Sequence, residues 1–222
     1  MWRALLDLCF PPRCAACDAF SAAPFCATCA TSLYPVASPL CPRCGLPFDG
    51  GVDHVCADCR AHPPPFRRAS AALRYGGELQ HALLRLKFAS RPDLARRLAP
   101  LMPPLPDCDR VVPVPLHRRR LARREYNQAL LLARAAWPGA RIDPFALERT
   151  RDTPPQATLR GALRRTNLRG AFLASARRVD GRRVVLVDDV LTTGTTAAEC
   201  ARALRRAGAT SVDVVTLART VA

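Results

Sequence analysis

The segment 184–196 holds the residues whose types and order indicate chemistry most directly. Four apolar residues end in two adjacent carboxylates, Asp188 and Asp189, and a turn follows that contains Thr192, Thr193, Gly194, Thr195 and Thr196. Backbone N–H groups and hydroxyls of such a turn can bind a phosphate at the positive end of a following helix, and Gly194 permits close approach. The carboxylates can accept hydrogen bonds from two neighbouring sugar hydroxyls. We therefore predict a site for a ribose 5-phosphate at this turn.

A second group of chemically active residues is formed by cysteines near the start of the chain. Eight of the eleven cysteines form CxxC pairs, which are Cys14/Cys17, Cys26/Cys29, Cys41/Cys44 and Cys56/Cys59. Two intervening residues direct both sulfurs toward one ion, and two such knuckles complete a tetrahedral Cys₄ shell that suits structural Zn²⁺. We expect sequential pairing of the knuckles, with interleaved pairing left open. A redox dithiol or an iron–sulfur site is the alternative, although neither needs four regularly spaced pairs.

The other cysteines and one histidine carry weaker signals. Cys9, Cys108 and Cys200 lack partners at ligand spacing, so we predict that they are small buried hydrophobic residues. His54 lies two residues before Cys56 and is a possible substitute ligand, but a surface position is expected.

Short apolar runs that alternate with helical patterns must position these residues. Strands are predicted at 71–75, 111–114, 184–187 and 212–217, and helices at 78–88, 127–136 and 196–206. The alternation of strand and helix predicts an α/β domain with a parallel sheet. The segment 150–180 has no clear period, and we interpret it as a long mobile segment that closes as a lid.

The domain boundary is predicted near residue 62, because three prolines follow at 63–65. This places a small Cys-rich double zinc ribbon at 1–62 and the α/β domain at 63–222. Asp7 interrupts the apolar start, so a short docking helix is expected at 1–10 rather than a signal peptide. No apolar run reaches the roughly 18–20 residues of a membrane span, and a cytoplasmic protein is expected.

The basic residues are concentrated in the middle of the chain. Of 34 basic and 18 acidic residues, the segment 61–180 contains 24 and 9, whereas 1–60 contains 4 and 5. Such a field attracts polyanions, among them phosphorylated small molecules, nucleic acids and acidic surfaces. A compositional preference for arginine is the alternative, since Lys87 is the only lysine. Eight thiolates and two zinc ions would lower the net charge from +16 to about +12 and make the ribbon an acidic cap.

The segment 184–196 resembles the phosphoribosyl pyrophosphate (PRPP) motif of type I phosphoribosyltransferases. The cysteine-rich start and several later stretches resemble the ComF (competence protein F) family over essentially the whole chain. These stretches are Tyr75-Gly76-Gly77, Leu86-Lys87-Phe88, Val112-Pro113-Val114-Pro115, Tyr126-Asn127-Gln128-Ala129, Gln156 and Asn167-Leu168-Arg169-Gly170-Ala171-Phe172. One position departs from the family, whose members usually have glycine where this chain has Glu125.

The resemblance implies a type I phosphoribosyltransferase-like domain that binds PRPP with Mg²⁺. The C-terminal half is also similar to glutamine-PRPP amidotransferases, which implies that Arg118 and Arg119 face the pyrophosphate. A solvated basic face or a nucleic-acid contact is the alternative for these two arginines. His117 is a candidate general base, with a loop histidine that contacts phosphate or solvent as the alternative.

Three functions remain open at this point. The first is a PRPP-binding accessory protein of natural competence, DNA uptake or DNA utilisation that contacts single-stranded DNA through its arginines. The second is a metabolic phosphoribosyltransferase that transfers ribose 5-phosphate from PRPP to a base or amine of unknown identity and releases pyrophosphate. The third is an adaptor without catalysis, whose ribbon recruits a protein partner.

Overall fold

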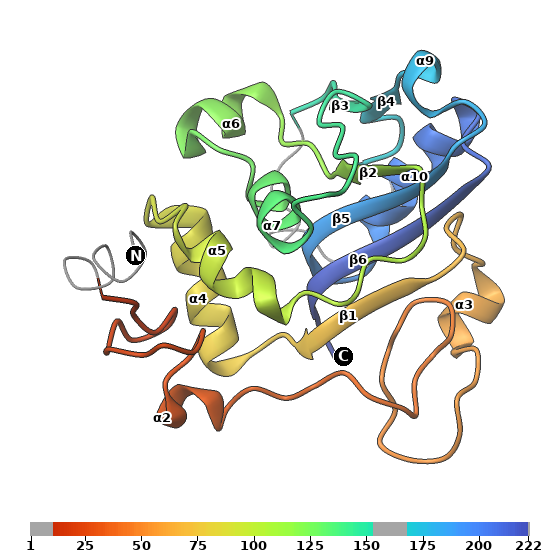
Figure 1. Cartoon of the computed structure of the whole chain (residues 1–222). Helices are drawn as coiled ribbons and strands as arrows, with labels where there is room; N and C mark the ends of the chain where they lie inside the picture. The colour runs from red at the N-terminus through yellow and green to blue at the C-terminus, as the bar shows by residue number, and fades with distance from the viewer. Residues whose placement is uncertain (1–10, 153–167, 222) are drawn as a thin grey trace.

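A parallel four-stranded sheet forms the centre of the computed structural model, which describes residues 11–152 and 168–221 (Figure 1). The strand order is β1–β6–β5–β2, and the strands span Ala69–Arg74 (β1), Ser211–Arg219 (β6), Arg183–Leu191 (β5) and Arg110–Pro113 (β2). The ladder between β2 and β5 stops at the pair Pro113–Val187, whereas β6 pairs with β5 as far as Leu191. The end of β5 that carries Asp188 and Asp189 is therefore paired on one side only. All four predicted strands are confirmed.

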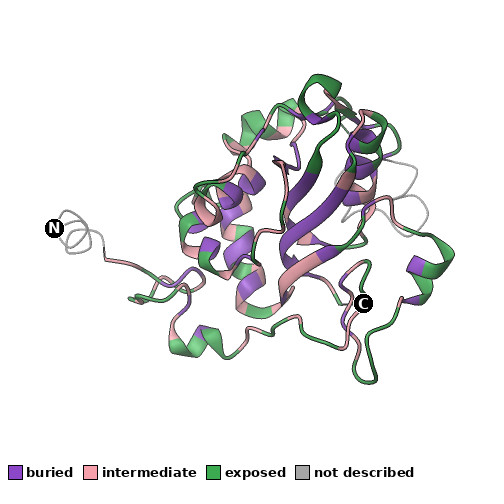
Figure 2. Ribbon diagram, turned by 45° about the vertical axis from the view of Figure 1, so that its right-hand side comes forward, coloured by how far each residue is buried: buried purple, intermediate pink, exposed green. Residues whose placement is uncertain are grey.

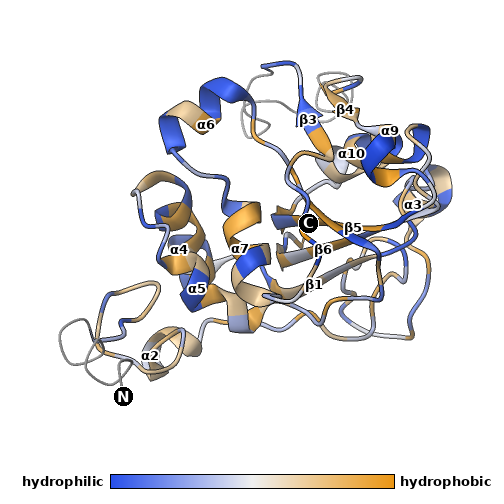
Figure 3. Cartoon of the chain, turned by 45° about the horizontal axis from the view of Figure 1, so that its top comes forward, coloured by the Kyte–Doolittle hydropathy of each residue, from blue (hydrophilic) through white to orange (hydrophobic). Residues whose placement is uncertain are grey.

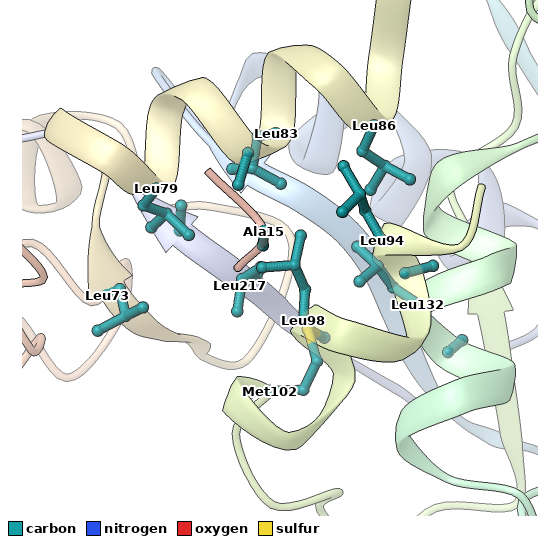
Figure 4. Close-up of a cluster of buried hydrophobic side chains, with 14 of the residues drawn as sticks. Ala15, Leu73, Leu79, Leu83, Leu86, Leu94, Leu98, Met102, Leu132 and Leu217 are labelled. Carbon is teal, nitrogen blue, oxygen red and sulfur yellow. The ribbon is translucent and has the colours of Figure 1, made fainter. Parts of the chain in front are cut away.

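Helices cover both faces of the sheet, because side chains alternate along a strand. On one face, Val185 and Val187 share a buried cluster with α4 (Gly77–Phe88), α5 (Leu94–Leu98) and α7 (Gln128–Ala136). Figure 4 shows the leucines of these helices gathered over the sheet. Buried residues lie along the strands and on the inner sides of the helices, whose outer sides are exposed (Figure 2).

The opposite face of the sheet packs against α10, which spans Thr195–Arg206. Val184 and Leu186 of β5 lie in one buried cluster with Cys200 and Leu204 of this helix. α10 begins directly after the threonine-rich turn, so the packing of this helix fixes the position of the turn at the end of β5.

The remaining elements are short. They are α2 (Ala27–Ala30), α3 (Ala57–Ala61), the 3₁₀ helix η1 (Ala99–Leu101), α6 (Arg118–Arg124), β3 (Leu147–Arg149), β4 (Phe172–Ala174) and α9 (Ala176–Val179). α6 stands away from the sheet and is largely hydrophilic (Figure 3).

The described part of the segment 150–180 is ordered, which corrects the expectation of a long mobile lid over its whole length. β4 pairs antiparallel with β3, and α9 follows directly. Leu168 and Ala171 are buried in the cluster that contains α10. Strands of three residues are too short to show a period, so the sequence pattern does not reveal them. The rest of the expected lid, 153–167, lies outside the described residues, as do the expected helix at 1–10 and Cys9.

The cysteine knuckles form two separate modules, which we call the first module (residues 12–31) and the second module (residues 39–60). Cys14, Ala15 and Phe25 of the first module are buried in the same cluster as the leucines of α4 and α5. Figure 4 shows Ala15 among these leucines. Arg85 of α4 also pairs with Asp18 of this module. The second module has a small buried cluster of its own around three cysteines.

The segment between the two modules runs along the outer edge of the sheet. Val36 N donates to Ala72 O at 2.9 Å, and Arg74 N donates to Tyr34 O at 2.7 Å. This pairing covers the exposed edge of β1 and places the modules at opposite ends of that strand (Figure 1). The boundary near residue 62 stays a prediction. None of the helices within 11–152 and 168–221 is long and apolar enough to span a bilayer.

Candidate functional site at the end of β5

Asp188 and the threonine-rich turn line one small cavity. Its walls come from β5, its neighbouring strands, and the start of α10: Val114, Leu186, Asp188, Val190, Leu191, Thr192, Gly194, Thr196, Ala197 and Val214. The cavity lies at the carboxyl end of parallel strands, where open α/β sheets bind their ligands. The structure thus brings Asp188 together with three of the five predicted turn residues.

Gly194 gives the turn its shape. It adopts φ +75° and ψ 0° and is the N-cap of α10, a helix of 12 residues. The left-handed conformation is favourable for glycine, because other residues have a Cβ that clashes there. Thr193 and Thr195, on either side of it, have their hydroxyls 2.9 Å apart. The first N–H groups of a helix of this length have no partner within the helix, and at the start of α10 they can bind an anion.

Asp189 has partners of its own on the side of α4 and α7. Its carboxylate lies 2.5 Å from the Lys87 ammonium and accepts a hydrogen bond from Gln128 Nε2 at 3.1 Å. Gln128 is oriented in turn by Arg124, whose Nη1 donates to its Oε1 at 2.5 Å. Asp189 is 2% exposed, so it forms a buried ion pair with Lys87.

The two adjacent carboxyl groups differ in their electrostatics. Burial and the neighbouring charge of Asp189 raise the pKa of Asp188 well above its usual value. Burial would raise the pKa of Asp189 too, but the charge and hydrogen bond of Lys87 outweigh it and lower that pKa. Asp188 thus favours its protonated form, while Asp189 holds the negative charge that Lys87 balances.

Lys87, Arg124, Gln128 and Arg149 were not predicted as site residues. Arg124 and Arg149 are cations whose pKa is lowered by burial, and both interact electrostatically with Asp188. Arg149 is 8% exposed, and its guanidinium lies over the Phe172 ring. Lys87 stands out in the sequence because it is the only lysine in an arginine-rich chain. Its pairing with Asp189 could not be predicted, because the two residues are 102 positions apart.

Arg118 and Arg119 lie on α6, and neither lines the cavity at Asp188. Their side chains are 89% and 80% exposed, and they form ion pairs at 3.6 Å with Glu148 and Asp152. His117 precedes the helix, and its Nδ1 lies 3.4 Å from the Arg119 amide nitrogen and 3.5 Å from Asp152. These contacts fit a histidine that caps a helix, and the pyrophosphate role of the two arginines stays a prediction.

Glu125 ends α6 in a left-handed conformation, with φ +70° and ψ −15°. The resemblance to the ComF family leads us to expect glycine at this position, and glycine adopts the observed φ without a Cβ clash. A glutamate here bears the strain of its own Cβ.

The cysteines form two groups that fit zinc. Cys14, Cys17, Cys26 and Cys29 lie together, as do Cys41, Cys44, Cys56 and Cys59, with the sulfurs of each group within 4.8 Å of one another. In a tetrahedron of Zn–S bonds of about 2.3 Å, neighbouring sulfurs lie about 3.8 Å apart. The Cys17–Cys26 and Cys44–Cys56 sulfur distances are 3.7 and 3.8 Å. Sequential pairing of the knuckles is thereby confirmed.

Backbone N–H groups favour the thiolate form of one cysteine in each module. Burial raises the pKa of Cys14 and Cys41, but N–H donors outweigh it and lower these values to about 6 and about 7. His54 is outside both groups, because its ring stacks on Phe48 with centroids 4.0 Å apart. Of the unpaired cysteines, Cys200 is fully buried as predicted, while Cys108 is half-buried.

Comparison with known proteins assigns domains to both parts of the chain. Residues 5–60 match the double zinc ribbon domain family, and residues 147–221 match the phosphoribosyl transferase domain family. The chain is also similar to glutamine PRPP amidotransferase from B. subtilis, at 30% identity over 56% of this chain and 25% of that one, with a TM-score of 0.36. The fold and domains thus define a phosphoribosyltransferase-like α/β protein with an N-terminal double zinc ribbon.

Full-length relatives identify the family. The chain is 39% identical to DNA utilization protein YhgH of Salmonella typhi over 208 residues, which cover 88% of this chain and 90% of that protein. It is 40% identical to DNA utilization protein YhgH of Escherichia coli K12 over 195 residues, covering 82% and 85%. It is 32% identical to competence protein F of Haemophilus influenzae over 197 residues, covering 82% and 85%. The chain belongs to the competence protein F (ComF) family.

Proposed function

We propose that this protein binds PRPP, or a related ribose 5-phosphate, at the end of β5 and uses that site in DNA utilisation or DNA uptake. The observation that carries the proposal is that Asp188, Thr192, Gly194 and Thr196 lie around one small cavity of about 20 Å³, at whose opening the ligand would bind. The 5-phosphate would bind the turn at the N-terminus of α10, and a ribose hydroxyl would donate to Asp188.

Asp189 has a supporting role in this proposal. Its ion pair with Lys87 and its bond from Gln128 fix the end of β5 from the side of α4 and α7. Mg²⁺ would arrive with the ligand, because within 11–152 and 168–221 the groups that could hold a metal are the two cysteine sets. Such an ion typically bridges phosphate oxygens and keeps several waters.

Single-stranded DNA is the proposed polymer partner. α6 has exposed arginines over most of its length and no buried residue, and Phe88, which is 72% exposed, lies under the Arg124 guanidinium beside it. Few aromatic residues accompany the arginines, so phosphate contacts would dominate and affinity would fall steeply with salt. An affinity for a single strand that stays constant between low and moderate salt would contradict this partner.

Turnover of PRPP is the less favoured outcome. His117 is held by the cap of α6 and by Asp152, and among residues 11–152 and 168–221 no histidine, His117 included, lines the cavity at Asp188. Incubation with PRPP, Mg²⁺ and a panel of bases and amines should therefore release no pyrophosphate. Pyrophosphate release with any acceptor would favour the metabolic transferase instead.

We place the protein in the cytoplasm, and the cysteine chemistry supports this location. Eight of the ten cysteines in the described ranges lie in two Cys₄ groups that fit zinc rather than in disulfides, which do not persist in the cytoplasm. A protein partner of the ribbon stays a prediction. Phe20 and Val52, exposed on the first and second module, are the apolar side chains at which to test it.

Calorimetric titration with PRPP and Mg²⁺ tests the proposed site. Wild-type protein should bind, and Asp188→Asn should lose at least about tenfold in affinity, as expected for a lost charge-assisted hydrogen bond. Asp107→Asn is the matched control, because Asp107 is 84% exposed and pairs with Arg183 at the opposite end of β5. Wild-type affinity in Asp188→Asn, or no binding by the wild type, would overturn the proposal.

A further inference from the structure

Arg219, the last residue of β6, has a buried guanidinium that donates to carbonyl oxygens from three segments. It is 7% exposed. Nη1 donates to Leu191 O at 3.1 Å, to Thr220 O at 2.9 Å and also to Thr192 O, while Nε donates to Cys44 O at 3.3 Å. One side chain thus contacts the start of the threonine-rich turn and a knuckle of the second module.

Arg219 contacts two parts of the protein that we expect to bind ligands, the threonine-rich turn and the second cysteine module. Leu191 and Thr192 line the cavity with Asp188, and Thr192 opens the turn that would hold the phosphate. Cys44 is one of the four cysteines of the second module. A larger cavity of about 1260 Å³ has Cys44, Cys59, Thr192 and Arg219 among its lining residues.

The charge of Arg219 needs a counter-charge. Within the described ranges, no carboxylate lies within ion-pairing distance of it, and its hydrogen-bond partners there are neutral carbonyl groups. A buried cation without an anion is costly. A zinc ion with four thiolates carries a net charge of −2, so the filled second module supplies the missing negative charge next to Arg219.

The second module packs directly against the backbone of β1, so a change in the module can affect the sheet. Ala69 N of β1 donates to Arg43 O at 2.8 Å. Gly45 has φ +65°, and a Cβ on it would lie 2.8 Å from Ala69 O. The knuckle therefore fits directly against the backbone of the sheet, with Arg219 as its link to the turn.

We propose that Arg219 is a positioning residue that couples the second module to the threonine-rich turn, so that zinc in the module and a phosphate ligand on the turn stabilise each other. With zinc bound, Cys44 O and the thiolates hold Arg219, and Arg219 holds the carbonyls of Leu191 and Thr192 in place. Loss of zinc releases this contact and loosens the turn. Since such coupling is reciprocal, a ligand on the turn must also slow the loss of zinc.

The test measures zinc retention module by module, using PRPP with Mg²⁺ as the probe. Zinc-loaded full-length protein is treated with a chelator and iodoacetamide, and alkylated peptides are then counted. Trypsin cleaves after Arg13, Arg43 and Arg60, so peptide 44–60 carries three ligands of the second module. Peptide 14–43 carries all four ligands of the first module together with Cys41 of the second, so fragment-ion spectra assign each alkylated cysteine to its module. PRPP should slow alkylation of peptide 44–60 at least about fivefold, the lower end of typical coupling, and leave the first module unchanged.

Two arginine variants identify the link. Arg219→Gln should accelerate ligand-free alkylation of peptide 44–60 and abolish protection by PRPP. Arg97→Gln is the matched control, because Arg97 donates to carbonyls of the first module, among them Arg13 O at 3.1 Å and Ser21 O at 2.8 Å. It should accelerate alkylation of the first module alone. If Arg219→Gln does not fold, Arg219→Lys keeps the charge but not the planar fork and should lose most of the protection.

The outcomes separate this inference from the proposed function on which it rests. If calorimetry shows PRPP binding to the wild type but peptide 44–60 is not protected, the coupling is wrong and the PRPP site stands. Undiminished protection in Arg219→Gln or Arg219→Lys would remove Arg219 as the link. If the wild type does not bind PRPP at all, the proposed function fails first, and the coupling to that ligand fails with it.

Discussion

Two neighbouring aspartates at the end of β5 have different chemical environments. Asp189 is paired with Lys87 and Gln128, whereas Asp188 lines the cavity with the threonine-rich turn. The sequence suggests equivalent roles for the two carboxylates, because adjacency along the chain says nothing about their partners. The structure separates a group that stabilises the end of the strand from a group that is available to a ligand.

This separation predicts that Asp189→Asn destabilises the fold. The substitution leaves the Lys87 ammonium without its buried counter-charge, which should lower the free energy of unfolding by about 3 kcal/mol. Chemical denaturation measures the change, and the double variant with Lys87→Met should recover most of it. Asp188→Asn should leave the free energy of unfolding nearly unchanged. Equal stability losses in the two single variants would contradict the assignment.

A second prediction concerns pH. Because the pKa of Asp188 is raised, a ligand hydroxyl that donates to its carboxylate favours the ionised form and competes with a proton there. PRPP affinity should therefore rise with pH below that pKa, by at most about tenfold per pH unit. Calorimetry in buffers of different ionisation enthalpy should detect release of this proton. Asp188→Asn is the control, because protons that it releases on binding come from the ligand phosphates and not from residue 188. Equal proton release by the wild type and Asp188→Asn would refute the prediction.

At the scale of elements, α6 is an example of a helix that the local sequence pattern does not predict. Five arginines in seven residues leave no apolar period, so the helix was not predicted. The strands β3 and β4 were not predicted for a different reason. Strands of three residues are stabilised by pairing with a partner distant in sequence, and local sequence does not show that pairing. In contrast, β5 and α10 were predicted, since a buried parallel strand and an amphipathic helix each carry their own pattern.

Glu125→Gly should stabilise the protein. Glu125 has φ +70° at the end of α6, and glycine adopts this conformation without the Cβ clash. We expect a gain of about 1 kcal/mol in the free energy of unfolding, measured by the denaturant midpoint. Glu125→Ala is the matched control, because it removes the carboxylate but keeps the Cβ. A gain of the same size in Glu125→Ala would show that charge, rather than backbone strain, is responsible.

At the scale of the whole molecule, the two zinc modules are built into the α/β domain. The first contributes Cys14, Ala15 and Phe25 to the core of α4 and α5, and the second is tied to the sheet through Arg43 and Arg219. The cysteine spacing predicts the metal shells and favours their sequential pairing, because ligand spacing is local. It does not predict the docking, which depends on contacts between residues far apart in the chain.

Removal of zinc should therefore destabilise more than the modules. Chelation should lower the melting temperature of the α/β domain by at least about 4 °C, which corresponds to roughly 1–2 kcal/mol in a chain of this size. Differential scanning calorimetry of the zinc-loaded and chelated protein measures this shift. Cys108→Ser is the control, because Cys108 is not a ligand and its variant should respond to chelation like the wild type. An unchanged transition after complete zinc removal would show that the modules are independent.

The most direct test of the central claim is a crystal structure of the full-length protein grown with PRPP and Mg²⁺. We predict the 5-phosphate on the backbone N–H groups of Thr192–Thr196, a ribose hydroxyl on Asp188, and Asp189 still paired with Lys87. Density for PRPP elsewhere on the protein, or an empty turn with Asp188 in its present position at saturating ligand, would contradict the account.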